Sequence, residues 1–159
     1  MIMNENIKIS TAVLCDLDSI LKLQKTAFLS EAELYNNYDI EPLTQTIESI
    51  RSDYQNYIFL KAEYENKIIG SVKARENDGQ CWIGKLMVDP KFQNMGIGRK
   101  LLQEIELKFP NAKQYFLFTG SNSTKNINLY ESLGYKKAEE FCDDKTPHIV
   151  LIKMLKTII

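Results

Sequence analysis

The strongest constraint on the fold is a succession of β-rich runs in the middle of the chain, followed by a helix and one further apolar run. The three β-rich runs occupy residues 57–64, 67–75 and 80–88. Their separators, Glu65-Asn66 and Asn77-Asp78-Gly79, have the length and residue types of hairpin turns, so the runs predict an antiparallel meander. An amphipathic segment at about 96–109 then predicts a helical crossover to a parallel strand at 115–118, because a short turn cannot make that connection. Together these segments predict an α/β domain with a mixed, mostly antiparallel sheet.

The segments before the meander add a strand and two helices. Residues 7–13 alternate between apolar and polar side chains, which is typical of a half-buried strand. The next segment predicts a helix with Asp16 as its N-terminal cap. Its apolar face contains Leu17, Ile20, Leu21, Gln24, Ala27 and Phe28. The polar stretch 31–44 shows no clear pattern and leads to a second short helix ending near Tyr54.

The segments after the crossover helix predict one more helix and the last strands. The run 115–118 is short, apolar and aromatic, as in a strand buried on both faces. A helix is expected at about 124–133, with Gly134 in the position of a C-terminal cap. Two strands, at 135–142 and 148–155, complete the pattern.

Length and composition are typical of one globular domain. The chain has 159 residues, of which 44% are hydrophobic and 26% charged, and a formal net charge of −1. We expect a single domain over residues 1–159, with a core at about 7–155, about six to seven strands and about four helices. This charge offers no bulk attraction to nucleic acid or to an anionic membrane. No apolar run approaches the ~20 residues of a membrane-spanning helix, and no signal-peptide pattern opens the chain.

The cysteines argue against a disulfide framework and against a metal site. Cys15, Cys81 and Cys142 are odd in number, widely spaced and without the spacing of metal ligands. We therefore expect reduced thiols, a cytoplasmic location and no bound metal.

The segment most informative about function joins the third β-rich run to the crossover helix. Gly96 and Gly98 lie where that helix begins, and glycine lets the backbone approach a ligand closely. The unpaired N–H groups of a first helical turn suit phosphate oxygens. Arg99 and Lys100 follow in the same turn, where positive charge opposes the helix dipole unless an anion is bound. The alternative is that both basic side chains simply extend into water.

Two other phosphate motifs fit this chain poorly. A dinucleotide-binding fingerprint requires a third glycine where Leu101 stands. A P-loop could be read over residues 79–85, but Leu86 replaces the Ser or Thr that binds magnesium.

At this point the residues resemble the GNAT superfamily of N-acetyltransferases. The resemblance rests on Val88-Asp89-Pro90, on Gln93-x-x-Gly96-x-Gly98 with the basic pair, and on the later segment 126–135. The order of elements agrees from about residue 7 to residue 155. The resemblance implies a GNAT-like fold with a splayed pair of parallel strands, and acetyl-CoA as the co-substrate.

The resemblance also implies which residues bind acetyl-CoA. The loop and helix start would surround the pyrophosphate, the preceding strand would contact the pantetheine arm, and the later helix would add further contacts. The implied residues are Leu86, Met87, Val88, Gln93, Asn94, Met95, Gly96, Ile97, Gly98, Arg99, Lys100, Ser123, Asn126 and Tyr130. Ser123 stands where many relatives have asparagine, so it is alternatively the N-cap of its helix.

Tyr130 is the one catalytic residue that the resemblance implies. A phenol with a pKa near 10 can protonate a leaving thiolate whose conjugate acid has a pKa near 8.5, provided that it lies within hydrogen-bond reach. The alternative is a packing role, because Ile127, Tyr130 and Leu133 share one helical face.

The general base is not identified by sequence. Many relatives have a glutamate in the strand before the loop, whereas here the corresponding positions are Gly84 and Lys85. The chain offers other candidate bases, but each is more simply explained as a surface or structural group. They are Asp39, Glu41, Glu76, Asp78, the pair Asp143-Asp144 and the single histidine, His148. The aromatic residues Tyr35, Tyr38, Tyr54 and Tyr57 could line the acceptor pocket or cover the core.

Two functions remain open from the sequence. The first is an N-acetyltransferase that acts by direct attack in a ternary complex, with a small-molecule or peptide amine as acceptor. The second is a non-catalytic acyl-CoA sensor or interaction domain of the same fold. A homodimer is possible, since relatives often pair through edge strands.

Overall fold

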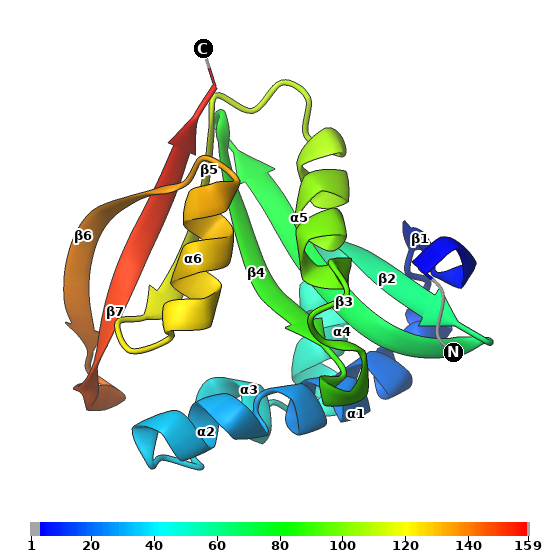
Figure 1. Cartoon of the computed structure of the whole chain (residues 1–159), viewed down its shortest axis with the longest axis horizontal. Coiled ribbons are helices and arrows are strands. Elements are labelled where there is room, and N and C mark those ends of the chain that lie inside the picture. Colours follow the sequence, from blue (N-terminus) through cyan, green and yellow to red (C-terminus); the bar gives the residue numbers. More distant parts are fainter. Residues whose placement is uncertain (1–3, 159) are drawn as a thin grey trace.

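The computed structural model describes residues 4–158 and contains one seven-stranded sheet with helices on both faces (Figure 1). The strands lie in the order β1-β2-β3-β4-β5-β7-β6. Their bounds are β1 Lys8–Thr11, β2 Ile58–Tyr64, β3 Lys67–Asn77, β4 Gln80–Val88, β5 Gln114–Gly120, β6 Lys136–Asp143 and β7 Thr146–Thr157. Only β4 and β5 are parallel among these pairs, which confirms the mixed, mostly antiparallel sheet. Residues 1–3 and 159, included in the predicted domain, lie outside the described residues.

The helices are unevenly distributed along the chain. The α-helices are α1 Leu17–Ala27, α2 Leu29–Tyr35, α3 Glu41–Thr44, α4 Ile47–Asn56, α5 Ile97–Leu107 and α6 Thr124–Ser132. Three 3-10 turns are η1 Asn4–Asn6, η2 Leu14–Asp16 and η3 Pro90–Phe92. The segment 31–44, which shows no pattern in the sequence, thus contains most of α2 and all of α3. Within residues 4–158, no helix has both the length and the apolar character that crossing a bilayer requires.

The turns of the meander have the geometry that their residues favour. Both residues of the β2–β3 turn, Glu65 and Asn66, have positive φ angles of 50° and 63°. Asp78 and Gly79 repeat this between β3 and β4, with 54° and 82°. Such turns follow the right-handed twist of antiparallel strands. Gly134 has a φ of 96° and follows α6, which confirms its role as a C-terminal cap.

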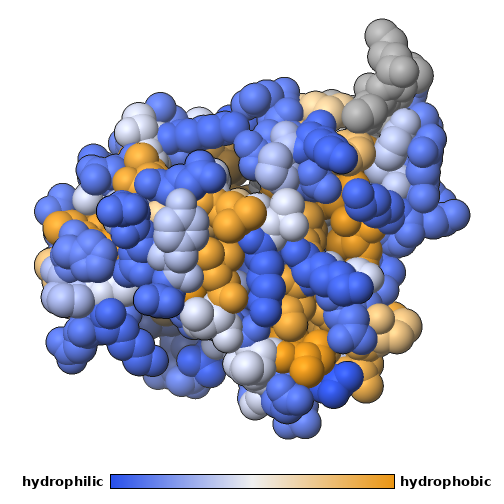
Figure 2. Space-filling view, turned by 90° about the horizontal axis from the view of Figure 1, so that it is seen from below, coloured by the Kyte–Doolittle hydropathy of each residue, from blue (hydrophilic) through white to orange (hydrophobic). Residues whose placement is uncertain are grey.

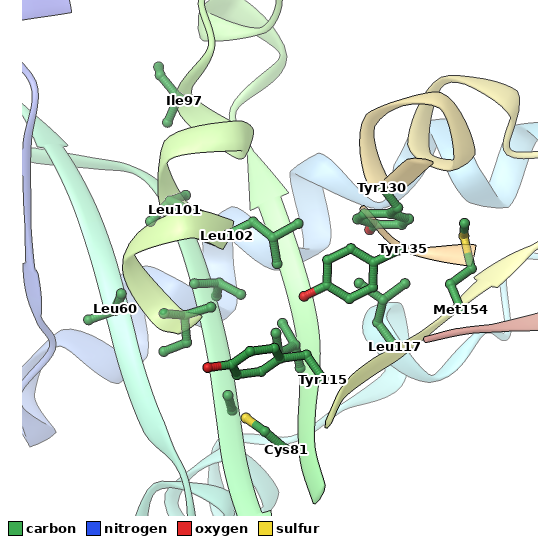
Figure 3. Close-up of a cluster of buried hydrophobic side chains, with 14 of the residues drawn as sticks. Leu60, Cys81, Ile97, Leu101, Leu102, Tyr115, Leu117, Tyr130, Tyr135 and Met154 are labelled. Atoms are coloured by element: carbon green, nitrogen blue, oxygen red, sulfur yellow. The ribbon is translucent and has the colours of Figure 1, made fainter. Parts of the chain in front are cut away.

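Each face of the sheet has its own apolar core. Helices α5 and α6 cover one face, where Leu101, Leu102 and Tyr135 are at most 1% exposed (Figure 3). On the other face, α1 and α4 bury Leu17, Ile20 and Ile50. The two cores hold β3 and β4 between helices, so the end of β4 is positioned firmly.

The parallel pair separates along its length. The β4–β5 ladder comprises residues 80–82 of β4 and 114–116 of β5, ending at the pair Trp82 and Phe116. Further on, β4 contains a bulge in which Lys85 has a φ of 54°. The two strands therefore diverge toward Val88 and Gly120, and this confirms the expected splay.

Two local predictions are wrong. The run 115–118 is not buried on both faces, because Phe118 is 41% exposed. The helical core on that face packs mainly against β3 and β4 and leaves Phe118 of β5 uncovered. Asp16 does not cap α1 through its side chain. Its carboxylate instead accepts a hydrogen bond from the Val13 N–H and pairs with Lys61.

Candidate functional site

A cavity of about 610 Å³ lies where β4 and β5 diverge. Its walls come from α2, the end of β4, the start of α5 and the start of α6. The face of the molecule that carries α1 to α3 is largely polar, and exposed apolar residues form patches on it (Figure 2). Leu34 of α2 both lines the cavity and is 50% exposed. The cavity is therefore open to solvent beside α2.

The cavity brings together most of the residues predicted to bind acetyl-CoA. The predicted residues that line it are Leu86, Met87, Val88, Gln93, Asn94, Gly96, Ile97, Gly98, Arg99, Ser123 and Asn126. Met95, Lys100 and Tyr130 are not among the lining residues. Met95 packs against the α5-side core, and Lys100 is exposed.

The loop before α5 has an unusual backbone. Asp89 follows β4 and is the N-cap of the 3-10 turn η3, where its carboxylate accepts a hydrogen bond from the Lys91 N–H. Asn94 and Gly96 then adopt left-handed conformations, with φ angles of 64° and 79°. The chain thereby enters α5 with the N–H groups of its first turn at the cavity wall, where they have no acceptor within the helix. The guanidinium of Arg99 also lies here and donates to Ser132 Oγ at 2.7 Å.

The opposite wall is a cluster of hydrogen bonds between α2 and the start of α6. Ser123 Oγ donates to Glu31 Oε2 at 2.8 Å, and Asn126 Nδ2 donates to Glu31 Oε1 at 3.1 Å. Tyr35 adds a contact between its hydroxyl and Ser123 Oγ at 2.8 Å. The close approach of Tyr35 requires glycine at position 120, because a Cβ on Gly120 would lie 1.8 Å from the Tyr35 hydroxyl oxygen. Ser123 thus occupies the N-cap position, but its side chain bonds to α2 and does not cap α6.

Glu31 is a charged residue of this site that sequence reasoning missed, as it also missed Lys125. It opens the unpatterned segment 31–44 and belongs to no motif. Its partners lie 92 and 95 residues away along the chain. No local signal could have placed its carboxylate in the cavity wall.

Tyr130 lies beneath the cavity wall, in the core. It is 7% exposed and its ring lies 6.2 Å from that of Tyr135 (Figure 3). Burial raises the pKa of its phenol well above the ordinary value, and the negative charge of Glu31 raises that pKa further. The hydroxyl of Tyr130 therefore stays protonated at neutral pH.

The other candidate bases lie away from the cavity lining. Lys85, at the position of the customary strand carboxylate, pairs with Glu41 and donates to Gln45 Oε1 at 3.1 Å. Burial lowers the pKa of Lys85, while Glu41 opposes that shift. Asp39, Glu76, Asp78, Asp143, Asp144 and His148 are exposed. In the described part of the chain, no three His, Cys, Asp or Glu side chains gather as a metal site would require.

A family comparison agrees with this geometry. Residues 17–135 match the sequence model of the Acetyltransferase (GNAT) family. A curated relative, the UPF0157 protein YqkA of Bacillus subtilis (strain 168), is 28% identical over 120 residues. That alignment covers 76% of this chain but 34% of the relative, so the chain spans about a third of YqkA's length.

Solved structures share the whole fold. The ribosomal-protein-S18-alanine N-acetyltransferase of Escherichia coli superposes with a TM-score of 0.77 at 20% identity, covering 96% of this chain and 94% of that one. PaiA N-acetyltransferase from Thermoplasma acidophilum, solved with coenzyme A, gives 0.75 at 19% identity, with 96% and 99% covered. For yncA from Salmonella typhimurium, solved with its cofactor acetyl-CoA, the TM-score is 0.74 at 19% identity, with 97% and 95% covered. Since the family model matches most of the chain and the fold agrees throughout, this protein belongs to the GNAT family of acetyltransferases.

Proposed function

We propose that this protein transfers an acetyl group from acetyl-CoA to a primary amine of a small molecule or peptide. The observation that supports this most is the cavity between the splayed strands, with the first turn of α5 at one end and the edge of β4 along one side. Two of the similar structures contain coenzyme A or acetyl-CoA.

The proposed co-substrate lies along this cavity. The N–H groups at the start of α5, with Arg99, receive the pyrophosphate, because a helix N-terminus favours anions. The unpaired edge of β4 at 86–88 offers main-chain groups to the pantetheine arm. One of its N–H groups polarises the thioester carbonyl, a contact that strengthens as charge develops on the oxygen.

The reaction proposed is direct attack in a ternary complex. The amine nitrogen bonds to the thioester carbon, the C–S bond breaks and the thiolate leaves. Tyr130, which stays protonated at neutral pH, is the proposed donor of a proton to that thiolate. Burial makes its phenol a weaker acid, so the transfer requires a direct hydrogen bond from its hydroxyl to the leaving sulfur. Over the part of the chain that the structure describes, no cysteine lines the cavity, which supports transfer without a covalent enzyme intermediate.

Release of free thiol tests this proposal. The protein is incubated with acetyl-CoA and a panel of amines that includes small diamines, amino acids and peptides with free N-termini, and the thiol is measured against time. Amine-dependent release is the expected result. Tight binding of acetyl-CoA without release for any amine would instead support the acyl-CoA sensor, for which the missing strand carboxylate is the motivating feature.

The remaining expectations concern the protein's surroundings. We propose a cytoplasmic location, in which the exposed thiols of Cys15 and Cys142 stay reduced. Fractionation of cells tests the location, and light scattering of the purified protein tests whether it forms a homodimer.

A further inference from the structure

The carboxylate of Glu31 is held in the cavity wall without a cationic partner. Both of its oxygens are oriented, one by Ser123 Oγ and the other by Asn126 Nδ2. Each oxygen can accept further hydrogen bonds, since a carboxylate offers about four acceptor positions. Within residues 4–158, no ion pair involves Glu31. Its side chain is half-buried, so a ligand in the cavity can reach it.

The charged groups around the cavity leave Glu31 as its available carboxylate. The cations that line the cavity, Arg99 and Lys125, bond to Ser132 and to Gln93. Among the described residues that line the cavity, no other is Asp or Glu. Lys85 and Glu41 neutralise each other elsewhere. A cationic amine entering the cavity therefore meets one negative side chain.

Glu31 also lies close to the proposed acid. Its carboxylate accepts a hydrogen bond from Asn126 of α6, and Tyr130 lies one helical turn further along the same helix. The negative charge of Glu31 also contributes to the raised pKa of the Tyr130 phenol. Glu31 comes from α2 and Tyr130 from α6. An amine in the cavity would contact Glu31, whereas Tyr130 lies beneath the cavity wall.

We propose that Glu31 is a catalytic residue that binds the acceptor amine and takes its proton during acetyl transfer. This inference rests on the proposed N-acetyltransferase function. It supplies the base that the strand position, occupied here by Gly84 and Lys85, does not provide.

The proposed cycle conserves protons. The ammonium form of the acceptor first loses one proton to solvent. As the nitrogen bonds to the thioester carbon, its second proton passes to the Glu31 carboxylate. The C–S bond breaks, and the thiolate takes the Tyr130 hydroxyl proton. Glu31 then returns its proton to the Tyr130 phenolate, so that both residues are reset and the products are amide and thiol.

Glu31→Gln tests the assignment because it removes the charge with little change in shape. We expect kcat to fall by about a hundredfold or more, the range of general base catalysis, while acetyl-CoA affinity changes less than threefold. The matched control is Glu33→Gln, which removes the same charge from an exposed position of the same helix and is expected to keep kcat. Thermal unfolding of each variant verifies that it is folded.

A second variant separates a chemical role from a packing role. In Glu31→Ala, added formate can occupy the vacated volume and accept the proton, so we expect formate to restore part of the lost turnover. A purely structural residue would show no such rescue.

The outcomes distinguish this inference from the proposed function. Near-normal kcat in Glu31→Gln, or a loss of turnover matched by an equal loss of acetyl-CoA affinity and unrelieved by formate, overturns the role of Glu31 alone. Failure of the wild-type protein to release thiol with any amine overturns both.

Discussion

At the scale of single residues, the two loop glycines differ in what requires them. Gly96 has a φ of 79°, a conformation that side chains disfavour. Gly98 is not among the glycines with positive φ, and a Cβ there would lie 3.7 Å from Leu129 and Val88, an ordinary contact. Neither the backbone conformation nor the packing therefore excludes alanine at position 98. A ligand that lies close to the backbone is the reason that remains for glycine there.

Gly98→Ala is predicted to separate stability from binding. Replacing a helical glycine by alanine raises the free energy of unfolding by about 0.5–1 kcal/mol. The added methyl group should lower acetyl-CoA affinity because it projects into the cavity. Urea denaturation and calorimetric titration measure the two effects. Unchanged affinity would contradict the placement of the co-substrate against this turn.

Tyr130→Phe is predicted to reduce turnover far more than binding. It removes the proposed proton donor and keeps the ring that packs against Tyr135. We expect kcat to fall by about a hundredfold, with acetyl-CoA affinity nearly unchanged. Equal losses in both quantities would make Tyr130 a packing residue.

At the scale of elements, a buried ion pair joins α4 to the sheet. Lys73 of β3 has a side chain 5% exposed, and its ammonium lies 2.8 Å from Asp53 of α4. The same carboxylate oxygen accepts from Gln45 Nε2 at 2.8 Å, and the Lys73 ammonium lies 4.6 Å from the centre of the Tyr57 ring. These contacts hold α4 against β3, the neighbour of β4 in the sheet.

Asp53→Ala should destabilise the protein by about 3 kcal/mol, because it leaves the Lys73 ammonium buried without a counter-charge. The midpoint of urea unfolding measures this loss. Glu48→Ala, on the exposed side of the same helix, serves as the control and should change stability by less than about 0.5 kcal/mol. A similar small effect of Asp53→Ala would mean that the ion pair contributes little.

At the scale of the whole molecule, the three thiols report on the integrity of the core. Cys81 is fully buried beneath α5, while Cys15 and Cys142 are exposed. Burial, with smaller contributions from the charges of Glu76 and Glu106, raises the pKa of the Cys81 thiol to about 12. The reactive thiolate form of Cys81 is therefore almost absent at neutral pH.

A thiol reagent is predicted to modify the native protein at Cys15 and Cys142 only. Cys81 should react at a rate that follows unfolding of the core, because reagent reaches it only when β4 and α5 separate. Mass spectrometry of the labelled peptides, with and without denaturant, measures this. Rapid labelling of Cys81 in the native state would show that this core opens locally.

Much of the architecture follows from local sequence. The β-rich runs and their hairpin turns predict the meander, because alternation and turn chemistry act over a few residues. The glycines before α5 predict a backbone that a ligand can approach, and Gly96 indeed has a positive φ. Gly134 marks the end of α6 for the same local reason.

Only the tertiary structure decides what faces the cavity. Glu31 meets Ser123 and Asn126 across more than 90 residues of chain, and nothing near Glu31 in the sequence encodes that meeting. The exposure of Phe118 likewise depends on where the helical layer ends, not on the strand itself. Periodicity and turn residues act through neighbours along the chain, whereas the partners of a side chain depend on how separate elements pack. The sequence by itself therefore determined the elements and the glycine loop, and tertiary packing determined the carboxylate that faces it.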